Sequence, residues 1–259
     1  MTSHMAIGLL YRIYERNLLA GLDSTRLPNH IGVVLDGHRR HARAEGLPSY
    51  AESYREGMSR FEQFLGWADD LKIAAVTAWV LSPENLSRPA VELDPYYEVL
   101  IDLFGRLPDQ CAKYDMALKF IGSLDLLPRH LVEAAKTAEE RHPRGSRRLN
   151  IAMGYGGRQE IVDATRDLVA RLAAEGVPAD EIADHIDAQS LAGHMYSADL
   201  PDADLIIRTS GESRLSGFLL WQSAYSEFVF VDVNWPAFRR VDFLRALRDY
   251  EGRTRRFGQ

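Results

Sequence analysis

The stretch Ile31 to Arg43, IGVVLDGHRRHAR, decides the fold class of this 259-residue chain. A five-residue apolar run is followed at once by an acid, a glycine, two histidines and three arginines. A buried strand that ends abruptly in charge is typical of a parallel sheet, in which ligands bind outside the carboxyl ends of the strands. The pattern predicts a strand over 31–35 and a binding loop directly after it.

The same alternation continues outward along the chain, where short apolar runs are separated by helical periodicity without repeats or low-complexity linkers. This order predicts an α/β fold: a single domain with a mostly parallel six-stranded sheet flanked by helices, preceded by an N-terminal arm over 1–27 and spanning 28–259. The six expected strands are 31–35, 73–81, 117–122, 149–155, 204–209 and 227–232. The expected helices lie near 53–71, 94–113, 128–140, 158–175 and 241–253.

The segments after four of these strands are unusually polar, and parallel strands bring them to one edge of the sheet. They read DGHRRHAR, SPENLSR, GGRQE and SGESRLSG. We expect acids and arginines from these regions to converge: Asp36, Glu84, Glu212 and Glu227 with Arg39, Arg40, Arg43, Arg88, Arg208 and Arg214.

Arginine binds phosphate oxygens bidentately, and an acid among arginines has a use when Mg²⁺ bridges it to a phosphate. Asp36 is the expected Mg²⁺ ligand. An N-cap aspartate with solvated arginines would explain the first loop alone, but four such loops together favour phosphate binding. The apolar run Trp79 to Leu81 ends beside them, either as an ordinary buried strand or as the wall of an apolar tunnel. These features suggest a ligand with a diphosphate head and a hydrocarbon tail.

Composition narrows the function classes. A formal charge of -6 argues against a nucleic-acid partner, and the single Cys111 fits the reducing cytoplasm, where we expect this protein. No apolar run approaches the ~18 residues that span a bilayer. Ile7, Leu10, Tyr14 and Leu18 recur at helical spacing, which predicts an amphipathic helix packed on its own domain or a partner subunit, or else in peripheral contact with a membrane.

From about Pro28 to the C-terminus the chain resembles the cis-prenyltransferases, the family of undecaprenyl diphosphate synthase and short-chain Z-farnesyl diphosphate synthases. Four segments carry the resemblance, in the family's order: DGHRRHA, LSPENLSRP, NIAMGYGGRQEIVDA and DLIIRTSGESRLSGFLLWQSAYSEFVF. RRFG at 255–258 is similar to the family's C-terminal R-x-G element, which in these homodimers reaches into the neighbouring subunit's site.

The resemblance implies Mg²⁺-dependent transfer of a short allylic group, from dimethylallyl or geranyl diphosphate, onto a five-carbon diphosphate. It implies metal binding by Asp36 and Glu227, and it gives Ser82 and Asn85 a place beside the reacting carbons. It assigns the allylic phosphates to Gly37, Arg39, Arg40 and Arg88, and the acceptor's to Arg208, Arg214 and Ser216. Glu84, Arg256 and Gly258 complete the predicted substrate-binding set.

The departures from the family pattern are as informative as the matches. His38 stands where the family has asparagine, and His41 where it has tryptophan. Tyr50 and Tyr54 replace an expected arginine and histidine, and Ser213 replaces another histidine. A neutral imidazole can accept a proton, whereas a carboxamide cannot at neutral pH. His38 therefore bears on which proton leaves and on which acceptor is used.

Two outcomes follow for the reaction. A regular enzyme would add isopentenyl diphosphate and give a short Z-prenyl diphosphate, whereas an irregular relative joins an allylic diphosphate to dimethylallyl diphosphate head to middle and gives a branched, lavandulyl-type product. Alternatives are a long-chain polyprenyl diphosphate synthase, a non-catalytic partner subunit, and a nucleotide- or phosphosugar-binding protein. Bulky residues favour a short product if they plug the tunnel, although core packing also explains them: Trp79, Tyr97, Leu100, Phe104 and Phe120.

Overall fold

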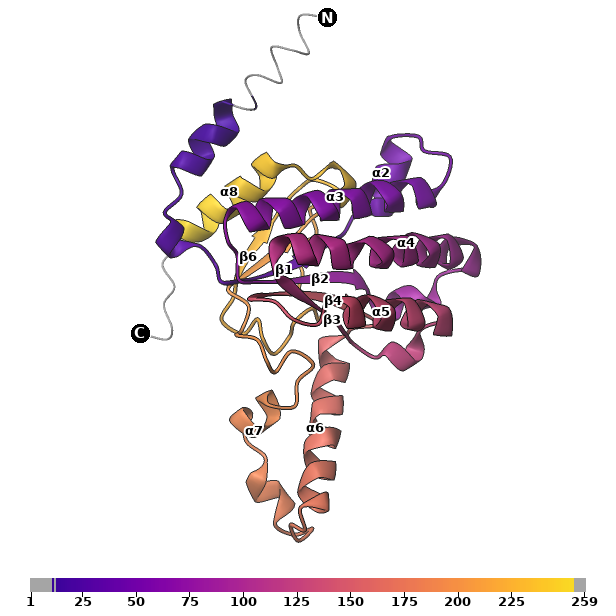
Figure 1. Cartoon of the computed structure of the whole chain (residues 1–259), viewed down its shortest axis with the longest axis vertical. Coiled ribbons are helices and arrows are strands. Elements are labelled where there is room, and N and C mark those ends of the chain that lie inside the picture. The colour runs from indigo at the N-terminus through magenta and orange to yellow at the C-terminus, as the bar shows by residue number, and fades with distance from the viewer. Residues whose placement is uncertain (1–10, 12, 254–259) are drawn as a thin grey trace, which may run out of the picture.

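The computed structural model describes residue 11 and residues 13–253. Its centre is a six-stranded sheet in which every neighbouring pair of strands is parallel, in the order β3-β4-β2-β1-β5-β6 (Figure 1). The strands are β1 (His30–Val34), β2 (Ala75–Leu81), β3 (Met116–Ile121), β4 (Arg147–Met153), β5 (Leu205–Arg208) and β6 (Glu227–Phe230). The predicted α/β class and all six predicted strands are confirmed, with ends shifted by up to two residues.

The predicted helices are also present. They are α3 (Tyr50–Asp70), α4 (Ala90–Tyr114), α5 (Arg129–Arg141), α6 (Gly157–Ala174) and α8 (Arg240–Glu251). Helix α4 begins four residues before the expected start and contains Pro95 and Pro108. The structure adds two short helices, α2 (His38–Ala44) and α7 (Ala188–Ala192). It also adds the 3₁₀ turns η1 (Ser24–Arg26), η2 (Pro83–Ser87), η3 (Leu124–Leu126), η4 (Ile182–His185) and η5 (Trp235–Ala237).

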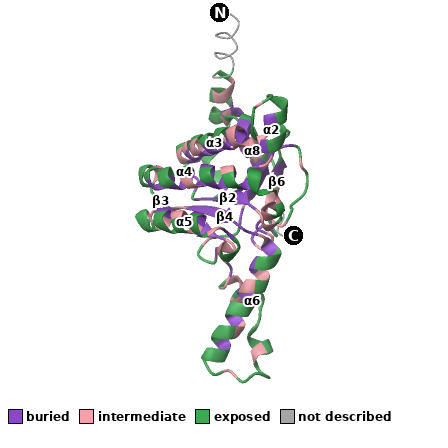
Figure 2. Ribbon diagram, turned by 90° about the vertical axis from the view of Figure 1, so that its right-hand side faces the viewer, coloured by how far each residue is buried: buried purple, intermediate pink, exposed green. Residues whose placement is uncertain are grey.

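Successive residues of each strand face opposite sides of the sheet, and the two sides have separate cores. On β2, Val76, Ala78 and Val80 join the larger core, which α3, α4, α5 and α8 cover. Trp79 points to the smaller core on the other side, with Tyr155 and Phe218. Strands β1 and β2 are therefore buried on both faces (Figure 2), which explains why their sequences read as continuous apolar runs.

Helix α6 leaves this body and projects away from it together with η4 and α7 (Figure 1). At the other end, residues 13–20 form a helix whose Leu18 packs on Val241 and Leu244 of α8. The expected packing of the N-terminal segment on its own domain is thus observed for Leu18, while Ile7 and Leu10 lie outside the described residues. Within the described part of the chain, no helix combines the length and apolar character that a membrane span requires.

Candidate active site

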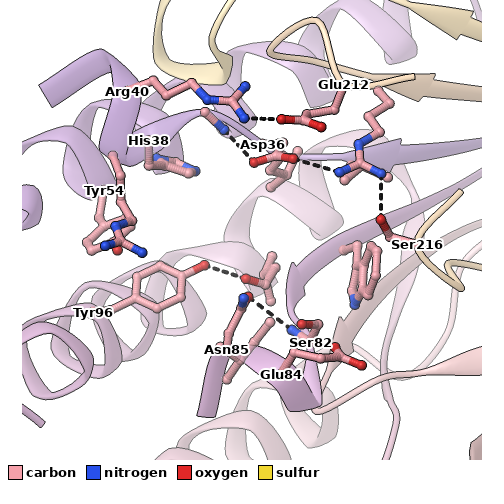
Figure 3. Close-up of a pocket in the computed structure, with 18 of the residues that line it drawn as sticks. Asp36, His38, Arg40, Tyr54, Ser82, Glu84, Asn85, Tyr96, Glu212 and Ser216 are labelled. Atoms are coloured by element: carbon pink, nitrogen blue, oxygen red, sulfur yellow. Dashed lines mark hydrogen bonds and ion pairs between the residues drawn. The ribbon is translucent and has the colours of Figure 1, made fainter. Parts of the chain in front are cut away.

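A pocket of about 730 Å³ opens at the carboxyl ends of β1, β2 and β5. Figure 3 shows Asp36, Glu212 and Ser216 on one side of it, His38, Tyr54 and Tyr96 on another, and Ser82, Glu84 and Asn85 on a third. The expectation that the polar loops converge is met for fourteen predicted residues, which all line this pocket: Asp36, Gly37, His38, Arg39, Arg40, Arg43, Ser82, Glu84, Asn85, Arg88, Arg208, Glu212, Arg214 and Ser216. The polar segment GGRQE after β4, which was also expected here, contributes no residue to the lining.

Asp36 lies at the centre of the charged side. Its Oδ2 accepts a hydrogen bond from Nη2 of Arg208 at 2.9 Å, and its Oδ1 accepts one from the Gly37 amide at 2.8 Å. Arg208 is only 5% exposed and donates through Nη1 to Oγ of Ser216 at 2.8 Å and to the carbonyl of Arg214. This buried arginine therefore joins the loop after β1 to the loop after β5.

Gly37 is required where these two loops meet. Its φ of +104° is unfavourable for residues with a side chain, and an added Cβ would lie 2.5 Å from Oδ1 of Asn234 and 2.9 Å from Cβ of Ser210. The close approach brings the start of α2 against the loop after β5. The acid and the arginines on α2 are thereby held beside Arg208.

Glu212 links two further arginines at the mouth of the pocket. One carboxylate oxygen pairs with Arg40 and the other lies 3.0 Å from Nη1 of Arg214. Arg40 also donates to the carbonyl and hydroxyl oxygens of Ser210, at 2.7 and 3.0 Å. The adjacent Arg40 guanidinium lowers the pKa of Glu212, so this carboxylate is ionised at neutral pH. Glu212 was among the acids expected to converge here.

His38 lies on the opposite side from Arg208 and is 8% exposed. Its Nδ1 lies 3.2 Å from the carbonyl oxygen of Ser53, which can only accept, so Nδ1 carries the proton. Nε2 has no partner within the described structure and keeps its lone pair. Burial lowers the pKa of His38 to about 4. The imidazole is therefore neutral at physiological pH, with its one acceptor nitrogen unused.

His41 does not share this position. It lies on α2, outside the pocket lining, and its Nε2 is 2.8 Å from a carboxylate oxygen of Glu56. Of the two histidine departures from the family pattern, only His38 lines the pocket.

Ser82, Glu84 and Asn85 enter the pocket from η2, the 3₁₀ turn that follows β2. The Ser82 amide donates to Oδ1 of Asn85 at 3.3 Å, and the Asn85 amide donates to the Ser82 carbonyl at 3.0 Å. These reciprocal bonds fix the turn. They hold three polar side chains where the apolar strand β2 ends.

The apolar part of the pocket is made by β1, β2 and two tyrosines. Tyr54 and Tyr96 contact each other with ring centroids 4.3 Å apart, and the Tyr96 hydroxyl donates to the Val80 carbonyl at 2.6 Å. Trp79 is stacked on Phe218 at 5.2 Å. The sequence predicted Tyr97 as a plug, but its neighbour Tyr96 is the residue that lines the pocket. Tyr97, Leu100, Phe104 and Phe120 belong to the large core and do not line the pocket.

The structure does not bring Glu227 to this cluster. Glu227 is the first residue of β6 and pairs in register with Leu205, three positions before Arg208. Three residues of strand separate it from the carboxyl edge by roughly 10 Å, and Oε2 of Glu227 lies 2.9 Å from Nη1 of Arg253. The expectation that Glu227 converges with Asp36 is therefore wrong within one chain. Arg256 and Gly258 lie outside the described residues.

The residues of the pocket can bind Mg²⁺ only if the substrate supplies some of the ligands. No three histidine, cysteine or carboxylate side chains between residues 13 and 253 are grouped to hold a metal by themselves. Mg²⁺, however, commonly uses one or two carboxylates and completes its shell with substrate phosphate oxygens and water. Asp36, about one third exposed to the pocket and surrounded by arginines, suits that arrangement.

Comparisons with known proteins agree with this geometry. The family model described as putative undecaprenyl diphosphate synthase matches residues 34–258. The (2Z,6E)-farnesyl diphosphate synthase of Thermobifida fusca is 48% identical, over 96% of this chain and 97% of that protein. Isoprenyl transferase 1 of Corynebacterium efficiens is 46% identical, over 97% and 98%.

A solved structure is similar as well. Lavandulyl diphosphate synthase from Lavandula x intermedia, in complex with dimethylallyl diphosphate, matches with a TM-score of 0.84 and 31% identity, over 91% of this chain and all of that one. Sequence motifs, fold and pocket therefore agree, and the chain belongs to the undecaprenyl diphosphate synthase family of cis-prenyltransferases.

Proposed function

We propose that this protein is a Mg²⁺-dependent short-chain prenyltransferase that condenses dimethylallyl or geranyl diphosphate with a five-carbon diphosphate. The observation that carries the proposal is a single pocket lined by Asp36 and several arginines together with the apolar ends of β1 and β2, two tyrosines and a neutral imidazole. Such a pocket suits a substrate that has a dianionic or trianionic head and an apolar tail.

The charged side would bind the two diphosphates. Arg39, Arg40 and Arg88 would hold the allylic diphosphate, and Arg208, Arg214 and Ser216 the acceptor's diphosphate. Mg²⁺, held by Asp36 and phosphate oxygens, would supply positive charge that stabilises the departing diphosphate. Fixed guanidinium groups stabilise the same charge without reorganising during bond cleavage.

The apolar side would protect the allylic cation from water. After the new carbon–carbon bond forms, the product cation must lose a proton. Nε2 is the only nitrogen of His38 that can accept it, because Nδ1–H is engaged by Ser53; since Nε2 is shielded from solvent, the bound substrate must shift the ring to reach it. A pKa near 4 makes this imidazole a weak base, but a proton beside a carbocation is strongly acidic, so a weak base suffices.

Two acceptors remain in the proposal, and a different observation favours each. Isopentenyl diphosphate is favoured by the high identity to a (2Z,6E)-farnesyl diphosphate synthase. Dimethylallyl diphosphate, joined head to middle, is favoured by His38 in place of asparagine and by the likeness to lavandulyl diphosphate synthase. The tyrosines that close the pocket favour a short product over a long polyprenyl chain.

The decisive assay incubates the purified protein and Mg²⁺ with dimethylallyl or geranyl diphosphate, with and without isopentenyl diphosphate, and identifies the products by mass spectrometry. Product formed without isopentenyl diphosphate would eliminate the regular reaction as the sole activity. Asp36→Ala should lower turnover by orders of magnitude, whereas a non-catalytic partner subunit would keep its effect on another chain. Absence of product under every condition would refute the proposal.

The proposal includes a cytoplasmic homodimer in which Arg256 and Gly258 contribute to the neighbouring site. Strand β6 supports it, because it is an edge strand that exposes 42% of Phe230, whose ring stacks on Phe228. An exposed aromatic edge is commonly covered by another chain. Measurement of the mass in solution tests the dimer, and a monomer that retains full activity would contradict it.

A further inference from the structure

Glu92 is a buried acid directly behind the phosphate-binding side of the pocket. It lies in the first turn of α4 and its side chain is only 8% exposed. It does not line the pocket. A carboxylate removed from water destabilises a protein strongly unless cations and hydrogen-bond donors compensate it. The groups around Glu92 must therefore offset the cost of burying its carboxylate.

Three groups from three different elements meet one oxygen of Glu92. The Tyr54 hydroxyl on α3 donates to Oε1 at 2.9 Å. Nη1 of Arg88, which follows η2, lies 3.4 Å away, and Nε of Arg39 on α2 lies 3.7 Å away. All three partners line the pocket. A residue outside the pocket thus contacts three residues that form it.

The two arginines are held on one side and open on the other. The Arg39 guanidinium lies 5.5 Å above the Tyr50 ring while its side chain stays 44% exposed, and Arg88 stays 25% exposed. Two guanidinium groups this close repel each other, and the carboxylate between them offsets that repulsion. Both arginines can therefore direct their remaining N–H groups at one anion in the pocket.

We propose that Glu92 is a positioning residue that holds Arg39 and Arg88 at the spacing required by the allylic diphosphate, and that the Tyr54 hydroxyl fixes the orientation of its carboxylate. This inference rests on the proposed function, because it needs the allylic diphosphate at these arginines. Tyr50 and Tyr54, two of the departures from the family pattern, then support this arrangement from different positions: Tyr50 lies under Arg39, whereas Tyr54 donates to Glu92 and lies beside Arg88.

The test compares Glu92→Gln, Tyr54→Phe and a matched control. Glu62→Gln is that control, because the Glu62 side chain is 17% exposed and accepts two hydrogen bonds from Arg106, and neither residue lines the pocket. The readouts are the separate KM values of the allylic and acceptor diphosphates, and calorimetric binding of an unreactive allylic thiodiphosphate with Mg²⁺.

Glu92→Gln should raise the allylic KM and the Kd of the thiodiphosphate by about tenfold, with the acceptor KM within about twofold of the wild-type value. Tyr54→Phe should shift the same two constants in the same direction by a smaller factor, and Glu62→Gln should shift neither. A purely structural role is indicated, and the proposal overturned, if Glu92→Gln lowers only the melting temperature or changes both substrates equally. Wild-type protein that binds the thiodiphosphate but makes no product would instead refute the proposed function.

Discussion

Gly57 in α3 lies against the His38 ring and leaves no space for a side chain there. A Cβ at position 57 would lie 2.1 Å from Cε1, 2.7 Å from Nδ1 and 3.2 Å from Nε2 of His38. The ring cannot move freely, because it is buried and bonded to the Ser53 carbonyl. Gly57→Ala should therefore displace the imidazole from its place in the pocket.

The size of the effect follows from two opposing terms. Forcing a methyl group into a packed core costs about 1–3 kcal/mol, whereas alanine in a helix interior is better than glycine by about 0.5–1 kcal/mol. In a His38→Ala background the space is empty, so only the favourable term remains. The change in unfolding free energy caused by Gly57→Ala should therefore differ by about 1–3 kcal/mol between the two backgrounds, because the contribution of helix propensity is the same in both and cancels.

The assay is urea denaturation of the wild type, both single variants and the double variant, with turnover measured for each. Gly105→Ala in α4 is the matched control, because a Cβ there meets nothing within 4 Å, and it should stabilise both backgrounds equally. The reasoning is refuted if Gly57→Ala changes the free energy of unfolding by the same amount, within about 0.5 kcal/mol, whether or not His38 is present.

Three further predictions concern charge, coupling and the N-terminal helix. Because burial lowers the pKa of His38 to about 4, the unfolded chain binds a proton near pH 6.5 that the folded chain does not. The stability contributed by the neutral ring is present above pH 6.5 and is lost as the pH falls toward 4. Over this range the unfolding free energy of the wild type should fall by about 1.4 kcal/mol per pH unit more than that of His38→Asn. Equal dependence of the two unfolding free energies on pH would contradict this. Glu212→Gln should raise the KM of both diphosphates several-fold, because Glu212 pairs with Arg40 and Arg214, and a change in only one KM would argue against a shared role. Leu18→Ala should lower the unfolding free energy by about 2 kcal/mol without inducing vesicle co-sedimentation, because Leu18 packs on α8; unchanged stability together with vesicle binding would favour membrane contact.

The fold was predictable because burial on both faces leaves a local signature. The central strands are short apolar runs, and the rule about parallel sheets correctly places the polar segments after β1, β2 and β5 at one site. The same rule includes the segment after β4, which contributes no residue to the pocket lining. The strand order β3-β4-β2-β1-β5-β6 was not predictable in this way. Pairing between strands distant in sequence leaves no trace in the hydrophobic period of either strand.

The errors in the site have equally physical causes. Glu227 begins its apolar run instead of following it, so the same rule about carboxyl ends would have placed it at the opposite edge. Glu92 on α4 contacts Arg39 on α2, and Ser53 on α3 contacts His38 on α2. Both contacts join different helices. No spacing within a single segment reveals such contacts. They are also the residues that explain how Arg39 and His38 are held.

The replacement of asparagine by His38 adds a proton acceptor to the pocket without adding a charge. An exposed imidazole beside Asp36 would titrate near neutral pH, and as a cation it would compete with Mg²⁺ for that carboxylate. Burial against Gly57 and Tyr54 prevents this by lowering the pKa of His38, and the nearby Arg88 guanidinium acts in the same direction. Under the proposed function, the positive charge of the pocket then stays on its guanidinium groups, including Arg88 near the ring, while His38 remains neutral and able to accept a proton from a prenyl cation.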